Sequence, residues 1–406
     1  MTERLYYTDP FLQTFEARVV DVRSMPNGTA VVLDRSAFYP TSGGQPFDTG
    51  SIGSAGVRVV NVEEDEVTGE VLHYVEDASK LHIGELYECA YDAERRRDHM
   101  QQHTGQHVLS AAFEQLFKFS TVSFHMGDES CTIDLDTDGV TAGQIAAVEK
   151  VANEIIFGDR PVTIRFATPD EARSMGVRKI PAAEREKLRL IDIENFDLNA
   201  CGGTHVRSTG QIGSILIRKT EKVRQGVRVE FVCGMRAVAT ARRDSTALTD
   251  AAGVFSTHMY EVPQQSRKVL EELKGAQKIQ AKLLEEVAEL QAEQFLRSAL
   301  ELGSAKLVVH FFAERDLAFI RMLAQKMTRS EPSVALLSCG GPQPSLVFAQ
   351  SAGLTHDMGA LMKQTLQALG TRGGGNKDMA QGGAPDAERA EHAVTVAAEK
   401  LRSSTS

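Results

Sequence analysis

His103-Thr-Gly-Gln-His107 and Cys201-Gly-Gly-Thr-His205 are the two stretches that decide how this chain folds and what it can bind. Each stretch carries two metal-binding side chains four residues apart. On a helix, residues four apart share a face, so both imidazoles of the first pair can reach one ion. Glycines in the second stretch let a loop turn a thiolate and an imidazole toward one point. Three imidazoles and one thiolate suit tetrahedral zinc, so we expect His103, His107, Cys201 and His205 to bind one Zn²⁺.

Either pair alone would be weak evidence for a metal site, because two histidines four residues apart also occur on ordinary polar helix faces. The His-Glu-x-x-His motif of metalloproteases has the same spacing, and its glutamate acts as general base. Thr104 stands in the place of that glutamate here, which argues against a peptidase. The zinc prediction therefore rests on the two pairs together.

The composition is that of an ordinary globular protein. The chain has 406 residues, of which 42% are hydrophobic and 25% charged, and this length allows two or three domains. The first residues lack the apolar segment of a signal peptide, and no apolar run reaches about 18 residues, so we expect a cytoplasmic protein without membrane contact. The five cysteines are scattered, and apart from Cys201 we expect them to be small buried residues rather than disulfide partners.

Basic residues gather in three runs although the net charge is −10. The runs are Arg95 to Arg97, Arg173 to Arg189 with six basic against two acidic residues, and Arg207 to Arg228 with six against one. Such runs often form solvated faces of helices and strands. Because all three flank the predicted ligands, they favour a path for an acidic polymer, even though the total charge argues against indiscriminate nucleic-acid binding.

The pattern along the chain predicts an α+β multidomain protein. Residues 1–90 show short alternating apolar runs broken by Gly, Asn and Pro, which indicates a small β-barrel domain. Residues 91–240 alternate helical patterns, at 99–117 and 141–157, with strand-like runs, and this α+β domain holds the metal pairs. Residues 241–302 form a linker and a long helix, and residues 303–406 return to an α/β pattern.

The long helix is predicted between Pro263 and Leu302, where no proline interrupts the chain. Its apolar residues follow a 4-3 repeat: Val269, Leu273, Ala276, Leu283, Val287 and Leu290. At 1.5 Å per residue it would reach roughly 60 Å and could separate two domains as an arm. Core packing is the alternative for its last two turns.

Four motifs in this order resemble the freestanding alanyl-tRNA editing proteins (AlaX), in their long form, which are related to the editing and C-terminal domains of alanyl-tRNA synthetase. The motifs span nearly the whole chain: Phe38 to Gly50, with Thr-Ser-Gly-Gly-Gln at its centre, Gln101 to His107, Cys201 to His205, and Gly373 to Gly383. The resemblance implies a zinc-containing editing domain of the synthetase-editing type at 91–240. It also implies a DHH-associated domain at 303–406.

The resemblance implies a trans-editing hydrolase, an aminoacyl-tRNA deacylase that removes Ser, or Gly, from mischarged tRNA(Ala). The partner would be tRNA, and a homodimer could form through the long helix or the C-terminal domain. The chain leaves no room for a synthetase core ahead of residue 38, so we expect no use of ATP. Asp98-His99-Met100 is not a DHH triplet, which argues against phosphoester cleavage. A non-catalytic tRNA-binding protein and a deacylase for another aminoacyl-tRNA are the alternatives.

Three further site residues follow from the resemblance. Thr41 would face the amino-acid side chain, and a pocket that bonds the serine hydroxyl could reject alanine by roughly 10⁴-fold. Gln45 would brace the glycine motif, and His125 would be a polar pocket residue. Read without the resemblance, Thr41 is a turn residue and His125 a structural histidine. The loop from Gly373 to Gly383, with Lys377, could present N–H groups to phosphate, or be a plain surface loop.

Overall fold

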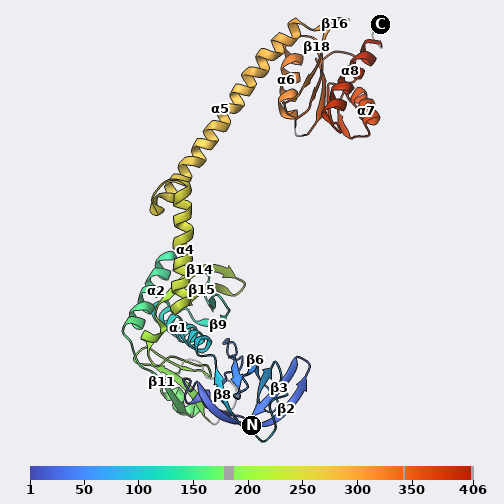
Figure 1. The fold of residues 1–406 in the computed structure, drawn as a ribbon. Coiled ribbons are helices and arrows are strands. Elements are labelled where there is room, and N and C mark those ends of the chain that lie inside the picture. Colours follow the sequence, from blue (N-terminus) through green and yellow to red (C-terminus); the bar gives the residue numbers. More distant parts are fainter. Residues whose placement is uncertain (178–186, 342, 404–406) are drawn as a thin grey trace. The chain divides into compact units, whose positions relative to one another are not determined.

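The computed structural model describes residues 1–177, 187–341 and 343–403. The chain divides into two compact units, Met1–Asp250 and Ala251–Ser406, and Figure 1 follows their elements in chain order. Helix α4 (Gly234–Val254) runs through the boundary expected at residue 240. The division into four parts therefore remains a prediction within these two units.

The first unit begins with a closed six-stranded barrel, as the alternating runs predicted. Its strands follow the order β2 (Thr14–Met25), β3 (Gly28–Leu33), β7 (Val71–Val75), β6 (Val57–Glu64), β5 (Gly50–Ile52) and β8 (Leu86–Tyr91). In β2 every second residue from Phe15 to Val19 is buried, so one face of the strand fills the barrel. The short strands β1 (Glu3–Arg4) and β4 (Arg35–Ser36) pair in parallel beside the barrel.

Helix α1 (Ala93–Phe117) carries the first metal pair and lies against an antiparallel sheet (Figure 1). The strand order in this sheet is β14 (Ile215–Val223), β15 (Gly226–Cys233), β10 (Cys131–Leu135) and β9 (Thr121–Met126). Asp92 caps α1 by accepting hydrogen bonds from the N–H groups of Glu94 and Arg95. The helix thus begins before His99, where the pattern placed its start, and the run Arg95 to Arg97 lies inside its first turns.

Helix α2 (Ala142–Phe157) packs on α1 and begins one residue after the predicted start at Thr141, which is its cap. Thr141 and Gln144 form a capping box, each side chain accepting a backbone N–H of the other. A third sheet of β11 (Val162–Ala167), β12 (Leu188–Ile193) and β13 (Asp197–Ala200) ends next to Cys201. The short helices α3 (Pro169–Ser174), η1 (Leu5–Tyr7) and η2 (Thr209–Ile212) complete the unit.

The second unit contains η3 (Met259–Glu261), the long helix α5 (Val262–Arg297) and a six-stranded sheet. The sheet order is β16 (Leu300–Leu302), β17 (Ala305–Phe312), β18 (Ser333–Cys339), β19 (Ser345–Gln350), β21 (Met379–Gly383) and β20 (Gly373–Gly375). The end of α5 and helix α6 (Leu317–Ser330) cover one face; α7 (Met358–Leu369) and α8 (Ala387–Ser403) cover the other. The mixed α/β architecture agrees with the expectation.

The long helix exists but ends at Arg297, because residues 300–302 form an edge strand instead of its last turn. Ala288, Ala292 and Leu296 are buried in the core of the second unit, so core packing accounts for its final turns.

The segment from Gly373 to Gly383 is a hairpin rather than an open glycine loop. Strands β20 and β21 pair through Gly373 with Gly382 and Gly375 with Ala380, so part of the backbone N–H groups is already used. Asn376 closes the turn by accepting hydrogen bonds from two following N–H groups.

Candidate metal centre

The structure brings the four predicted ligands together. His103 and His107 lie one turn apart on α1, and Cys201 and His205 lie in the loop after β13, with all four donor atoms within 4.8 Å of one another. The Nε2 atoms of His103 and His205 are each 3.4 Å from Cys201 Sγ. Tetrahedral zinc with ordinary bond lengths would hold such donors about 3.5 Å apart. The spacing therefore fits zinc.

Gln45, from the glycine motif of the barrel, orients the ring of His103. Its Oε1 lies 2.8 Å from His103 Nδ1 and accepts the N–H of Thr204 at 3.1 Å, while its Nε2 donates to Thr204 Oγ1 at 2.8 Å. Because an amide oxygen only accepts, the proton of His103 must be on Nδ1. The Nε2 lone pair is then free for a metal ion.

Thr104 and Asp197 do the same for the other two imidazoles. Thr104 Oγ1 donates to the carbonyl of Met100 and lies 3.1 Å from His205 Nδ1, so it can only accept from that ring. Asp197 Oδ2 accepts from His107 Nδ1 at 3.3 Å. All three rings thus present Nε2 to the same point.

Sequence reasoning missed Asp197, Thr204 and this role of Thr104. Thr104 occupies the place of a metalloprotease general base, and here it holds a ligand in its metal-binding tautomer. Asp197 belongs to no motif; only the strand β13 that precedes Cys201 turns its carboxylate toward α1.

Gly203 leaves room for the ring of His103. A Cβ atom at residue 203 would lie 2.1 Å from His103 Cε1, so any larger residue would push the imidazole away. Of the two glycines in Cys201-Gly-Gly-Thr-His205, Gly203 therefore serves close approach, and Gly202 has room for a side chain.

The cluster favours the metal-binding protonation state at Cys201 and His205, whereas at His107 it favours the protonated ring, from which a metal would have to displace a proton. Burial by itself would raise the pKa of the Cys201 thiol, but the neighbouring His103 and His205 outweigh it and hold that pKa well below its usual range. Burial also lowers the pKa of His205 well below its usual value. For His107, burial opposes protonation, yet the hydrogen bond to Asp197 raises its pKa to about 9.

The glycine motif reaches from the barrel to strand β9. The carbonyl of Gly44 accepts the N–H of Met126, and a Cβ at residue 44 would lie 2.7 Å from the carbonyl oxygen of Phe124. The ring of Phe124 is 5.4 Å from that of His103. Thr41 is exposed at the tip of the motif, with its N–H bonded to the carbonyl of Val62.

His125 follows Phe124 on β9 and is exposed. Successive residues of a strand point to opposite faces, so His125 faces away from the side on which Phe124 meets His103. The structure brings Gln45 into contact with the ligands and leaves Thr41 and His125 outside direct contact. Their roles in the pocket remain predictions.

Comparison with known proteins agrees with this arrangement. Residues 188–229 match the family model "Threonyl and Alanyl tRNA synthetase second additional domain", and residues 5–95 match "tRNA synthetases class II (A)". The alanyl-tRNA editing protein AlaX-L of Pyrococcus horikoshii is 30% identical, over 99% of each chain. The chain belongs to the alanyl-tRNA editing protein family.

Two alanine–tRNA ligases are similar over less than half of their own length. That of Pyrococcus abyssi is 31% identical over 97% of this chain and 43% of the ligase. That of Natronomonas pharaonis is 33% identical over 99% of this chain and 44% of the ligase. A solved C-Ala domain of Aquifex aeolicus alanyl-tRNA synthetase matches 26% of this chain and 97% of that domain, with 21% identity and a TM-score of 0.24.

Two arginines of the basic runs are interior residues in this editing-family member, which corrects their assignment to a surface. Arg96 is 1% exposed and forms a buried ion pair with Asp48, a residue of the glycine motif (Phe38 to Gly50). Its Nη1 and Nη2 also donate to the carbonyls of Pro10 and Ala37. Arg189 is likewise buried. The middle of its run, residues 178–186, lies outside the described residues.

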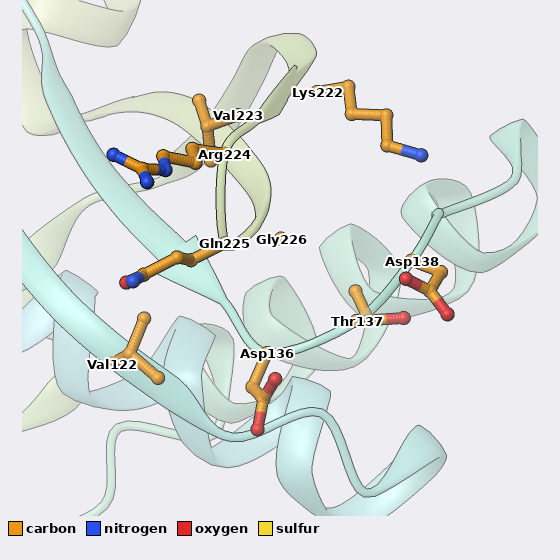
Figure 2. A pocket seen from close by; sticks show the side chains of 9 residues that line it. All are labelled: Val122, Asp136, Thr137, Asp138, Lys222, Val223, Arg224, Gln225 and Gly226. Carbon is orange, nitrogen blue, oxygen red and sulfur yellow. The ribbon is translucent and has the colours of Figure 1, made fainter.

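Half of the basic residues of the third run are neutralised by ion pairs. Arg218, Lys219 and Arg228 pair with carboxylates. Lys222 and Arg224 form no ion pair with a described residue, and they line a hollow of about 740 Å³ at the β14–β15 turn. Figure 2 shows their side chains pointing to opposite sides of this turn, with Asp136 and Asp138 also lining the hollow. This hollow shares no lining residue with the metal cluster.

The remaining predictions on composition can be compared directly with the structure. Cys89, Cys131, Cys233 and Cys339 are buried and unpaired, as expected, and Cys201 is the more accessible one. Within the described ranges no helix is both long and apolar enough to cross a membrane.

Proposed function

We propose that this protein hydrolyses the ester that joins a wrong amino acid to the 3′ end of tRNA(Ala), with Ser-tRNA(Ala) as chief substrate and Gly-tRNA(Ala) as a second. Water adds to the ester carbonyl, the bond to the tRNA 3′ oxygen breaks, and free amino acid and deacylated tRNA leave. The observation that carries the proposal is the four-donor cluster, one of whose ligands, His103, is bonded to Gln45 of the glycine motif. The name and near-complete coverage of the Pyrococcus horikoshii relative support it.

His103, His107, Cys201 and His205 would hold zinc, which when bound supplies a Lewis acid for the ester carbonyl or the attacking water. Gln45, Thr104 and Asp197 keep the three ring protons on Nδ1, so the ligands stay in their binding tautomers. Cys201 would be a ligand thiolate rather than a nucleophile. If all four donors bind together the centre is closed, so one must yield or the ion must act by positioning.

Thr41 would provide specificity from the exposed tip of the glycine motif. Its hydroxyl could bond the serine hydroxyl, which alanine and glycine lack. Thr41→Val keeps the shape and deletes this bond, so the rate on Ser-tRNA(Ala) should fall relative to that on Gly-tRNA(Ala) by about fivefold, corresponding to about 1 kcal/mol. An unchanged ratio would reduce Thr41 to a turn residue. His125 would line the same pocket only if substrate reaches its face of β9.

The deciding experiment is hydrolysis of Ser-, Gly- and Ala-tRNA(Ala) side by side, with metal content measured on the same samples. We expect Ser-tRNA(Ala) to be cleaved, Ala-tRNA(Ala) to be spared and about one zinc per chain. Cys201→Ala should abolish activity, whereas Cys339→Ala, at a buried cysteine of the second unit, should not. Full activity in a verified metal-free sample would exclude the zinc mechanism. Binding of tRNA without hydrolysis would favour a non-catalytic tRNA-binding protein, and cleavage of another aminoacyl-tRNA a different specificity.

The rest of the chain would serve tRNA binding and assembly in the cytoplasm, without ATP. Lys222 and Arg224 are cations that can meet phosphate, and Lys377 is exposed at the β20–β21 turn. On α5 a set of large apolar side chains is more than half exposed: Leu270, Leu273, Ile279, Leu283 and Leu290. A homodimer through this helix would bury them, and sedimentation of the wild type against Leu273→Lys and Leu283→Lys would test it.

A further inference from the structure

Arg189 on β12 is a buried cation without an ion pair to any described carboxylate. Only 8% of its surface is exposed, yet among the described residues its guanidinium donates hydrogen bonds to backbone carbonyl groups alone, and it lies 5.7 Å from the centre of the Tyr7 ring. Nε donates to the carbonyl of Tyr7 at 2.9 Å, and Nη1 donates to those of Cys201 at 2.7 Å and Gly203 at 2.9 Å. Burying a charge in this way costs several kcal/mol unless its bonds are well made, so a specific use is expected.

The backbone N–H and the backbone carbonyl of Cys201 both form hydrogen bonds with Arg189. The antiparallel register pairs Leu190 with Ala200, which places Arg189 beside Cys201 at the end of the ladder. The carbonyl of Arg189 accepts the N–H of Cys201 at 3.1 Å, while its side chain donates to the carbonyl of Cys201. The peptide groups on either side of this ligand are therefore fixed by one residue.

Nη1 of Arg189 also bonds to the turn that follows Cys201. Nη1 draws the carbonyls of Cys201 and Gly203 to one side of the loop. Between these two carbonyls, the N–H of Gly203 donates to Cys201 Sγ at 3.4 Å. This N–H supports the sulfur, and the turn brings Thr204 to Gln45 and His205 to the cluster.

We propose that Arg189 is a positioning residue that holds the loop Cys201–His205 in its metal-binding shape before the ion arrives. The inference rests on the zinc centre of the proposed function. Without the guanidinium, binding would have to order this loop, and the loss would appear in metal affinity. Changes in groups that orient ligands weaken metal binding by about 10–100-fold.

Arg160 provides a matched control. Its Nη1 also donates to two backbone carbonyls, those of Glu194 and Asn195, and its guanidinium lies over an aromatic ring, that of Phe196. These contacts hold the turn between β12 and β13, at the opposite end of the strands from Cys201. A lysine at either position keeps the charge and loses the fork of donors.

The experiment measures the zinc dissociation constant by competition with a chromophoric chelator, and the absorption spectrum of the cobalt-substituted protein. We expect Arg189→Lys to bind zinc about 10–100-fold more weakly and to change the cobalt–thiolate absorption, with Arg160→Lys like wild type in both. If folded Arg189→Lys has the zinc affinity and cobalt spectrum of the wild type, the role of Arg189 is wrong and the proposed zinc centre is unaffected. A wild-type protein that binds no zinc would overturn the metal centre as well.

A second measurement needs no variant, in case Arg189→Lys fails to fold. Amide hydrogen exchange on the metal-free wild type should show protection at Cys201 and Gly203 close to that of the zinc-loaded protein. Rapid exchange at these two amides without metal, and protection only with it, would show that the ion orders the loop and would overturn the inference.

Discussion

Gln45 and His103 are joined by a contact of 2.8 Å between Oε1 and Nδ1, although they belong to the barrel and to helix α1 and lie 58 residues apart. Both amide atoms of Gln45 are used, since its nitrogen donates to Thr204. One side chain therefore connects the glycine motif, the helix and the loop of Cys201. A change at Gln45 should be felt first in the metal centre.

We predict that Gln45→Ala weakens zinc binding by about 10–100-fold, because His103 loses the acceptor that fixes its tautomer. Gln45→Glu keeps an acceptor oxygen and should lose less. Chelator competition checks both variants, and deacylation at saturating zinc shows how much activity follows the metal. Equal zinc affinity in Gln45→Ala and wild type would mean that the ring is held by its helix alone.

A second prediction concerns the buried pair of Asp48 and Arg96. Asp48→Asn leaves an uncompensated guanidinium in the interior, which should lower the free energy of unfolding by roughly 3–5 kcal/mol. The pair of Asp134 and Arg228 is partly exposed, so Asp134→Asn should cost at most about 1 kcal/mol. Urea denaturation of both variants gives the comparison. Similar losses would contradict a special role for the interior pair.

A third prediction is a loss of stability in mild acid. Burial lowers the pKa of His73 to about 4, below the 6.5 of an ordinary histidine. The unfolded chain then binds this proton more readily than the folded one between these pH values. The stabilisation is complete above pH 6.5 and is lost as the pH falls toward 4, by up to about 3 kcal/mol.

The measurement is the free energy of unfolding from pH 7 to pH 4.5. His73→Gln should flatten the fall, although His99, whose pKa is also lowered to about 4 by burial, would keep part of it. His82→Gln, at an exposed histidine of the same unit, should leave the curve unchanged. A steep fall that persists in His73→Gln would assign the effect to other groups.

A fourth prediction separates catalysis from tRNA affinity. All four ligands and the glycine motif lie in the unit Met1–Asp250, so a chain ended at Glu261 should stay folded and bind zinc. It should hydrolyse Ser-tRNA(Ala) at saturating concentration with a raised KM, because binding contacts common to ground and transition states are lost. Steady-state kinetics decide: equal KM values would leave dimerisation as the better role for the second unit.

Local signals were enough for much of the fold. The helical pattern at 141–157 predicted α2, and the short alternating apolar runs of residues 1–90 predicted the barrel. The ligand set followed from spacing because a helix turn brings His103 and His107 together whatever surrounds them. Glycine content, by contrast, predicted a loop where strand pairing makes the hairpin at Gly373.

The rest depended on contacts between distant residues, which leave no period in the sequence. Arg96 and Arg189 look like members of basic surface runs, and only their partners, Asp48 and the carbonyl of Cys201, show that they are interior. Nothing in the sequence distinguishes Asp197 from the other carboxylates, and only the position of β13 places it against His107. Thr41 and His125 remain predictions because their partners would be substrate atoms.

The order of the ligands along the chain has a consequence for how the protein is made. Synthesis runs from the N-terminus, and His103 precedes Cys201 by 98 residues. At roughly 5–20 residues per second, the helix that carries the histidines waits on the order of 5–20 s before the thiolate is even polymerised. The complete donor set therefore exists only after residue 205 has been added, so capture of the ion by all four ligands is a late event in the synthesis of this unit.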